Sequence, residues 1–265
     1  MGILNVTPDS FYDGNPLLNL ESIIQKGLNL VAQGADIIDV GGESTRPGAK
    51  PVPLDVELSR VIPVVKSIRS QASIDISIDT TKAKVAESAI MAGATIINDV
   101  SGCSADSEMI PILQKYPKVK VVVMHARGNP ETMGKMTNYQ DLLRDIDSEL
   151  MLRLNLLSES KIEKERIIID PGFGFAKNTE QNLELLAHID QLHELGYPIL
   201  AGLSRKKFLG FIGGDIDADR RLPLTLAACF WLLIKGVQII RVHDVTEMVQ
   251  VRSLFNALVS RGGIK

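Results

Sequence analysis

A chain of 265 residues, 45% of them hydrophobic and 23% charged, has the composition of a globular protein with a large aliphatic core. Its net charge of −3 gives no overall positive field, so we expect no binding to nucleic acid or to an anionic membrane surface. No apolar run approaches the roughly 20 residues of a membrane span, and no leader pattern opens the chain, which predicts a cytoplasmic protein. Cys103 and Cys229 lack metal-ligand spacing and are expected to be structural thiols.

Apolar runs of strand length alternate with helical segments along the chain. The predicted strands are residues 1–4, 36–40, 74–78, 95–97, 119–123, 167–169, 198–202 and 237–243. The predicted helices are residues 20–33, 55–69, a helix that Thr80 is placed to cap and that ends near Met91, then 139–158, 182–195, 222–234 and 245–258. Trp231, among apolar neighbours, is expected in the core.

This alternation predicts an α/β fold in which parallel strands are covered by helices on their outer side. Eight strand units close most naturally into a single (β/α)8 TIM barrel over residues 1–265, with the active site at the carboxyl ends of the strands. An open doubly wound sheet is the alternative. It loses its best support because no G-x-G-x-x-G motif follows any predicted strand.

Polar residues stand where the predicted strands end. They are Asn5, Asp39, Asp79, Asn98, Asp99, His125, Asp170, Lys206, Arg241 and His243. Any one of them alone is consistent with a helix cap or a loop contact, but barrel strands direct their carboxyl ends into one mouth. We therefore expect these side chains to form one site, with the role of His125 left open.

The expected site has two chemically different sides. The acidic and amide side consists of Asp79, Asn98 and Asp170, and the basic side of Arg205, Lys206, Arg241 and His243. Two buried carboxylates and an amide suit a planar heterocycle with several N–H donors. The basic side lies at the seventh and eighth strands, a region that binds phosphate in many barrels. A Schiff-base role for Lys206 stays open, although its basic neighbours favour a hydrogen-bonding or electrostatic role.

Several segments are similar to the motifs of one enzyme family. They are residues 1–11 (MGILNVTPDSF), 41–48 (GGESTRPG), 79–80 (DT), 98–102 (NDVSG), 124–125 (MH), 170–175 (DPGFGF), 204–206 (SRK) and 241–245 (RVHDV). In this order, one per strand end, they closely resemble dihydropteroate synthase, a family of pterin-binding barrels. The resemblance implies a transferase of folate biosynthesis that condenses (7,8-dihydropterin-6-yl)methyl diphosphate with p-aminobenzoate to 7,8-dihydropteroate and diphosphate. It also implies sulfonamides as competitors and a homodimer.

The resemblance implies roles for individual positions. Asp79, Lys206, Arg241 and His243 would be catalytic, and the substrates would contact Thr45, Arg46, Pro47, Asp79, Asn98, Asp170, Phe175, Lys206, Arg241 and His243. The acidic and amide side would bind the pterin. Arg241 would stack on the pterin and, with His243 and the metal ligand Asn5, hold the diphosphate and its Mg²⁺. The loops 7–11 and 44–48 would close over the site.

The residues also predict how the reaction is accelerated. An aryl amine is a weak nucleophile, and no strong base stands among the candidates, so stabilising the leaving diphosphate should matter most. Asp79 can stabilise a cationic pterin-methyl species. We therefore expect an SN1-like substitution at carbon, with the two loops excluding water.

Two departures from the family pattern stand out. The chain starts at the first motif without the short hairpin that usually precedes it, which suggests a trimmed chain or a missing upstream segment, such as a fused pathway enzyme. Lys207 stands where some members have a serine beside p-aminobenzoate, which bears on sulfonamide affinity. Two alternatives stay open: a methyltetrahydrofolate:corrinoid methyltransferase, which needs neither the loop 44–47 nor the basic side, and a barrel that binds pterin without catalysis.

Overall fold

The computed structural model describes residues 1–6, 16–46 and 48–263. Its strands are β1 (Gly2–Asn5), β2 (Ile37–Gly41), β3 (Asp75–Asp79), β4 (Ile96–Asp99), β5 (Lys120–Met124), β6 (Ile167–Asp170), β7 (Leu200–Ala201) and β8 (Ile239–Ile240). Its α-helices are α1 (Pro16–Ala32), α2 (Leu54–Gln71), α3 (Ala83–Ala92), α4 (Met109–Lys115), α5 (Leu142–Glu159), α6 (Thr179–Ala187), α7 (Lys207–Ile212), α8 (Leu222–Ile234) and α9 (Val245–Val259). Short 3-10 helices are η2 (Met133–Lys135), η3 (Lys164–Arg166), η4 (Ile189–Leu195) and η5 (Ala218–Arg220).

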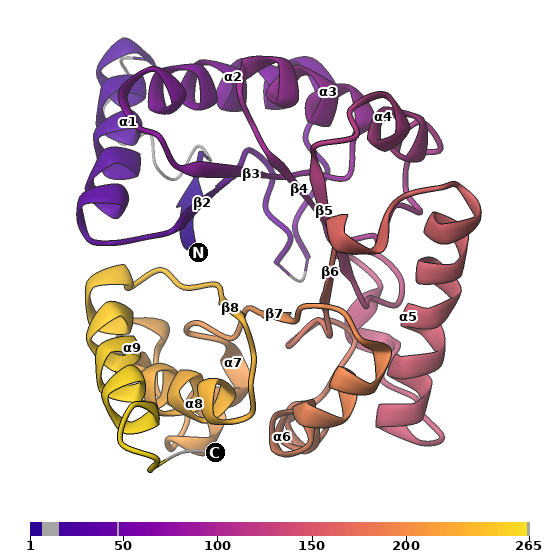
Figure 1. Ribbon diagram of the computed structural model, residues 1–265, viewed down its shortest axis with the longest axis vertical. Coiled ribbons are helices and arrows are strands. Elements are labelled where there is room, and N and C mark those ends of the chain that lie inside the picture. The colour runs from indigo at the N-terminus through magenta and orange to yellow at the C-terminus, as the bar shows by residue number, and fades with distance from the viewer. Residues whose placement is uncertain (7–15, 47, 264–265) are drawn as a thin grey trace.

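The strands close into a barrel. β1 to β6 form one parallel sheet in chain order, and β7 and β8 form a second. Single backbone bridges join the two sheets at both seams, Ile169 to Ile199 and Gly2 to Val242. At the second seam the Ile3 amide donates to the Val242 carbonyl at 2.9 Å. The helices surround the strands, and the first and last strands lie on the same side of the ring (Figure 1), which confirms the predicted (β/α)8 barrel.

Successive residues of each strand face opposite sides of the barrel wall. The outward residues, such as those of β2 and β3, pack against the helices in the main hydrophobic core. The inward residues form a separate apolar layer of Met1, Ile96, Val122, Ile168 and Leu200. In the same inward rows the register pairs Asp39 with Ser77 and Asp79 with Asn98. Polar residues near the carboxyl ends therefore stand above an apolar plug.

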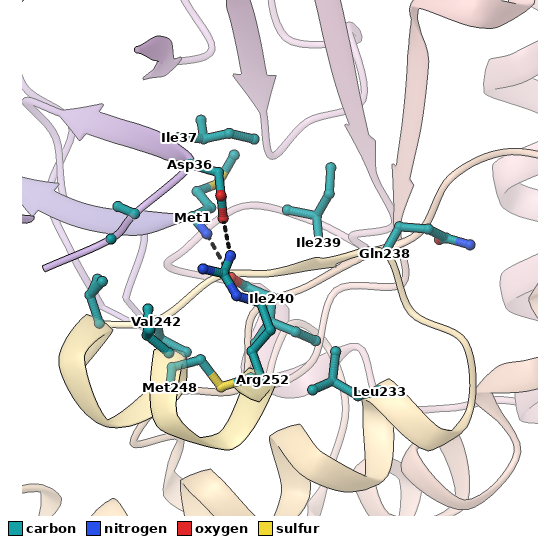
Figure 2. Close-up of a pocket in the computed structure, with 14 residues that line it drawn as sticks. Met1, Asp36, Ile37, Leu233, Gln238, Ile239, Ile240, Val242, Met248 and Arg252 are labelled. Carbon is teal, nitrogen blue, oxygen red and sulfur yellow. Dashed lines mark hydrogen bonds and ion pairs between the residues drawn. The ribbon is translucent and has the colours of Figure 1, made fainter. Parts of the chain in front are cut away.

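A cavity of about 240 Å³ lies at the amino ends of the strands, on the side opposite the polar rows. Its walls are formed by apolar residues of β8, α8 and α9 on one side and by Met1 and residues 34–37 on the other. Figure 2 shows Arg252 of α9 reaching Asp36, at 2.6 Å, and the amino group of Met1 close to the carbonyl of Ile240, at 2.9 Å. Burial lowers the pKa of this amino group. Among the helices that the structure describes, none has the length and apolar character needed to cross a membrane.

The structure corrects several predicted elements. The predicted helix 182–195 is wrong: α6 starts earlier, where Asn178 and Gln181 form a reciprocal capping box, and ends at Ala187 before η4 begins. Helices α4 and α7 were not predicted, because their few residues show no clear period. β8 is much shorter than the predicted 237–243.

Two residue-level predictions also fail. Thr80 does not cap α3; its hydroxyl donates to Glu57 at 2.7 Å, and Asp106 accepts the Ala83 amide of the first turn at 2.8 Å. Trp231 is 41% exposed and donates its indole N–H to the Leu186 carbonyl, so it lies on the outer surface of α8. Both cysteines are free and buried as predicted.

Candidate active site

The carboxyl ends of the strands enclose a polar pocket. It is lined by Thr45, Asp79, Asn98, Val100, Met124, Asp170, Gly172, Phe173, Phe175, Gly202, Lys206 and Arg241. The predicted pterin-binding residues are thus brought together from β3, β4, β6 and the segments after β7 and β8. Met124 and Gly202 were not predicted, and strand alternation could have found both, because each stands on an inward row.

Asp99 and His125 do not join this pocket, so the expectation that all strand-end residues share one mouth is wrong for them. Each follows an inward residue by one position and therefore faces the outer layer. Asp99 accepts hydrogen bonds from the amides of Ser101 (2.8 Å) and Cys103 (3.1 Å). His125 contacts Glu149 of α5 at 3.1 Å.

Arg241 joins the carboxylates instead of standing with the basic side. Its Nε donates to Asp39 at 2.7 Å and its Nη2 to Asp79 at 2.9 Å. Asn98 donates to the same Asp39 oxygen at 3.1 Å. Asp39 is fully buried, so it serves as an anchor below the pocket for Arg241 and Asn98. One oxygen of Asp79, Oδ1, is buried without a hydrogen-bond partner among the described residues.

The pocket shifts the ionisation of Asp79, Asp170 and Lys206 toward their neutral forms. Burial, and next the charge of Asp39, raise the pKa of Asp79 to about 7 against the pull of Arg241. Burial also raises the pKa of Asp170, whose Oδ1 accepts the Gly172 amide at 2.8 Å. Burial lowers the pKa of Lys206 to about 8, while Asp170 opposes the shift. A carboxylate and an ammonium thus change charge near the same pH.

His243 is held by a serine at the last strand. The backbone amide of His243 donates to Ser204 Oγ at 3.3 Å, and this oxygen lies 3.0 Å from His243 Nδ1. We assign the hydroxyl proton to the bond with Nδ1, which leaves the remaining ring proton on Nε2. Burial, and next Arg241, lower the pKa of His243 to about 4, so the imidazole is a neutral donor. Arg205 forms a double hydrogen bond with Asp244 (2.9 and 2.5 Å) and does not enter the pocket.

The loop after β2 lies beside the mouth. Thr45 lines the pocket and Arg46 is exposed. The base of the loop is fixed because Lys82 pairs with both Glu43 and Glu57 at 2.5 Å. Pro47 and the loop 7–11, both expected to act at the site, lie outside the described residues.

The aromatic contact of the pocket is made by Phe175. The Lys206 ammonium lies 4.4 Å from the centre of the Phe175 ring, which is cation–π distance. Lys207, the next residue, begins α7 and is exposed. The turn after β6 therefore faces the segment after β7 across the mouth.

Metal-binding capacity is limited in the described part of the chain. Residues 1–6, 16–46 and 48–263 contain no cluster of three or more His, Cys, Asp or Glu that could hold an ion. Asn5 ends β1 on an inward row, beside Gly41. Mg²⁺ commonly keeps several waters and takes one or two protein oxygens plus substrate phosphates. A single amide oxygen therefore fits a metal that arrives with a diphosphate.

The barrel and the residues at its mouth define a TIM-barrel enzyme with its site at the carboxyl ends of the strands. The family model described as pterin binding enzyme matches residues 1–243. A dihydropteroate synthase of Synechocystis sp. is 43% identical over 258 residues, 97% of this chain and 89% of that protein. The chain belongs to the pterin binding enzyme family and, within it, to the dihydropteroate synthases.

Solved structures of the family match in three dimensions. Dihydropteroate synthase from Clostridium difficile, in the presence of pteroic acid, has a TM-score of 0.91 and 44% identity, covering 97% of this chain and 95% of that one. The Xanthomonas albilineans enzyme with 4-aminobenzoic acid has a TM-score of 0.91 and 40% identity, covering 97% and 92%. The fold is therefore that of the family over nearly the whole chain.

Proposed function

We propose that the mouth of this barrel joins (7,8-dihydropterin-6-yl)methyl diphosphate to p-aminobenzoate, giving 7,8-dihydropteroate and diphosphate. The observation that carries the proposal is the convergence of Asp79, Asn98, Asp170 and Lys206 in one pocket. This set offers carboxylate and amide acceptors to pterin N–H groups and an ammonium to the pterin carbonyl. The structures of relatives with pteroic acid and 4-aminobenzoic acid support the same two substrate classes.

The pterin subsite is built from the acidic and amide side. Asp79 Oδ1 is buried and has no hydrogen-bond partner among the described residues. It would accept a hydrogen bond from a pterin N–H, and this bond would offset the free-energy cost of burying the oxygen. Asp170 is fixed by the Gly172 amide and would accept further N–H groups. Arg241 now pairs with Asp79, so stacking on a pterin requires it to loosen that contact.

The diphosphate subsite lies at β1 and β8. His243 would donate Nε2–H to a phosphate oxygen, with Arg46 closing from the loop, and Asn5 would supply one oxygen to Mg²⁺. When bound, Mg²⁺ supplies charge stabilisation of the leaving group. The neutral His243 is suited to this role because a donor without charge does not repel the metal.

The reaction breaks the bond between the pterin methylene carbon and the diphosphate oxygen, and the electron pair leaves with diphosphate. The amine nitrogen of p-aminobenzoate then forms the new C–N bond and releases one proton. Ionised Asp79 would stabilise the cationic pterin-methyl species between these events. Thr45, Arg46, Pro47, Phe175 and Lys206 would surround p-aminobenzoate, and sulfonamides would compete there.

The test is diphosphate release on mixing the protein with both substrates and Mg²⁺, with the product identified by mass. One dihydropteroate per diphosphate is expected. Some diphosphate release without p-aminobenzoate is expected if the C–O bond breaks first, and its complete absence would count against the SN1-like order. Tight pterin binding without product would favour the non-catalytic barrel.

We propose further that the protein acts as a homodimer in the cytoplasm. The outer face of α8 and α9 exposes Trp231, Ile234 and Leu254, which are apolar side chains suited to an interface. Light scattering at micromolar concentration tests this, and a monomer at that concentration would refute the dimer.

A further inference from the structure

Lys177 is a buried cation behind the active-site mouth that has no part in the reaction steps above. It lies in the connection between β6 and α6, shortly before α6 begins, and is only 8% exposed. Its Nζ lies 3.0 Å from the Gly172 carbonyl, 3.2 Å from the Phe175 carbonyl and 3.0 Å from His125 Nδ1. An ammonium has three N–H groups, so these three acceptors use all of them.

His125 holds Lys177 from the outer side of β5. Its Nε2 lies 3.1 Å from Glu149, which also accepts from Arg127 Nε at 2.9 Å. The Glu149 carboxylate can only accept, so Nε2–H donates to it and Nδ1 is the acceptor for Lys177. The backbone amide of His125 donates to the Asp170 carbonyl at 2.8 Å. One residue thus connects the barrel wall to the ammonium.

The Lys177 ammonium binds the carbonyls of Gly172 and Phe175, which are the two ends of the segment that lines the pocket. Gly172, Phe173 and Phe175 line that pocket, and the Phe175 ring lies under Lys206. The three acceptors of Lys177 are neutral, and burial lowers its pKa to about 7. A buried charge with no carboxylate in direct contact costs stability, and such a cost is typical of functional positions.

We propose that Lys177 is a positioning residue that fixes the Phe175 ring and, through it, the Lys206 ammonium, and so shapes the aryl-amine half of the site. Asp170 is held by the backbone amides of Gly172 and His125 and by the strand bonds of β6, none of which uses the Lys177 ammonium as donor, so the pterin half should depend on Lys177 less. This inference rests on the proposed function only for the identity of the aryl amine.

Arg166 provides a matched control. It is also a buried cation next to β6, and it donates to the backbone carbonyls of Leu113 (2.8 Å), Tyr116 (3.1 Å) and Val119 (2.8 Å). These bonds lie at the amino end of β6, at the opposite end of the strand from the mouth. Arg166→Met therefore reproduces the loss of a buried cation and its carbonyl bonds without touching the turn.

The experiment measures binding by calorimetry with two probes, pteroic acid, which spans both halves, and 6-hydroxymethyl-7,8-dihydropterin, which fills only the pterin half. We expect Lys177→Met to weaken pteroic acid binding by about tenfold or more and the smaller probe by less than about threefold. Arg166→Met should change neither by more than about twofold, although it lowers Tm. In turnover, KM for p-aminobenzoate should rise while KM for the pterin diphosphate stays near wild type.

The inference is wrong if Lys177→Met lowers Tm but binds both probes with wild-type affinity. Phe175→Leu should weaken pteroic acid by itself, and Lys177→Met should add little in that background, because both act on one ring; fully additive losses would also overturn it. If Lys177→Met does not fold, Lys177→Gln takes its place, because it removes the charge but keeps a hydrogen-bond donor. Its affinities for the same two probes are then compared with those of wild type. Wild type that binds pteroic acid without turnover would refute the proposed reaction and leave this binding comparison intact.

Discussion

At the scale of single residues, the pocket holds an acid and a base whose pKa values have moved toward each other. Burial and Asp39 raise that of Asp79 to about 7, and burial lowers that of Lys206 to about 8. The proposed chemistry uses Asp79 as an anion and Lys206 as a cation. Both hold these charges together only near neutral pH.

We expect a bell-shaped pH profile of kcat/KM for the pterin diphosphate. The acid limb should fall below about pH 7 as Asp79 is protonated, and the alkaline limb above about pH 8 as Lys206 loses its proton. Because the two groups interact, the limbs report the pair. Lys206→Arg stays charged, so it should move the alkaline limb to higher pH even where activity is reduced. If the limb does not move, the alkaline pKa belongs to a group other than Lys206.

Ser204 should control which nitrogen of His243 carries the proton. Ser204→Ala removes the hydroxyl that lies 3.0 Å from Nδ1 and leaves the ring free to change tautomer. We expect kcat to fall about tenfold and product inhibition by diphosphate to weaken, with pteroic acid affinity unchanged. Equal losses for diphosphate and pteroic acid would instead indicate a collapse of the pocket.

At the scale of elements, the sequence located all eight strands because each is an apolar run followed within a few residues by a polar one, although β7 and β8 are shorter than predicted. The length of a run does not show which of its residues face inward, and this is why Asp99 and His125 were assigned to the mouth. The contact of Arg241 with Asp79 joins residues 162 positions apart, so it appears only once the barrel closes. The sequence did not single out Lys177, because it stands beyond a strand end and contacts two backbone carbonyls and the ring of a residue 52 positions away.

The turn after β6 should not tolerate a side chain at Gly172. This glycine has φ +69°, and a Cβ would lie 2.1 Å from the His125 carbonyl oxygen. We expect Gly172→Ala to lower stability by about 2–4 kcal/mol and to abolish most activity. Gly134→Ala is the control, because a Cβ there meets nothing within 4 Å. Similar melting temperatures for the two variants would contradict this account.

At the scale of the whole molecule, the charges of the site are divided between the two sheets. Asp79, Asn98 and Asp170 belong to the six-stranded sheet, whereas Lys206, Arg241 and His243 follow the strands of the two-stranded one. Arg241 bridges this division, because it leaves β8 and pairs with carboxylates of β2 and β3. The same groups that form the site therefore affect the stability of the closed barrel.

Burial of Asp79 should make folding depend on pH. Its folded pKa of about 7 exceeds the ordinary 3.8, so between these values the folded protein binds more protons and stability falls as pH rises. Asp79→Asn lacks this dependence, and we expect it to gain about 1–2 kcal/mol over wild type between pH 5 and pH 8 while losing activity. The prediction is wrong if the free energies of unfolding of wild type and Asp79→Asn, measured in denaturant, change with pH in parallel.

Asp99→Asn is the matched control for that measurement. Asp99 is also buried, but it accepts bonds from two backbone amides and from the Ser101 hydroxyl at 2.6 Å. Burial raises the pKa of Asp99 as well, and the bonds from Ser101 and Cys103 oppose the shift. An amide has only one acceptor oxygen, so Asp99→Asn loses bonds that Asp79 does not make, and we expect it to be less stable than wild type at pH 7, where Asp79→Asn is more stable.

The two seams have a consequence for how the protein fails on heating. Ladders of paired residues join β1 to β6, whereas the β7–β8 pair is attached by one bridge on each side. The β6 side is the sparser seam, with the bond from the Ile169 amide to the Pro198 carbonyl, while Met1, Ile3 and Val242 bond across the β1 side. Local opening begins where the bonding is sparse, and there it would carry Lys206 and His243 away from the carboxylates before much secondary structure is lost. Thermal inactivation should therefore precede the loss of helical circular dichroism, and we expect the seams of the barrel, rather than its core, to set the highest temperature at which the enzyme works.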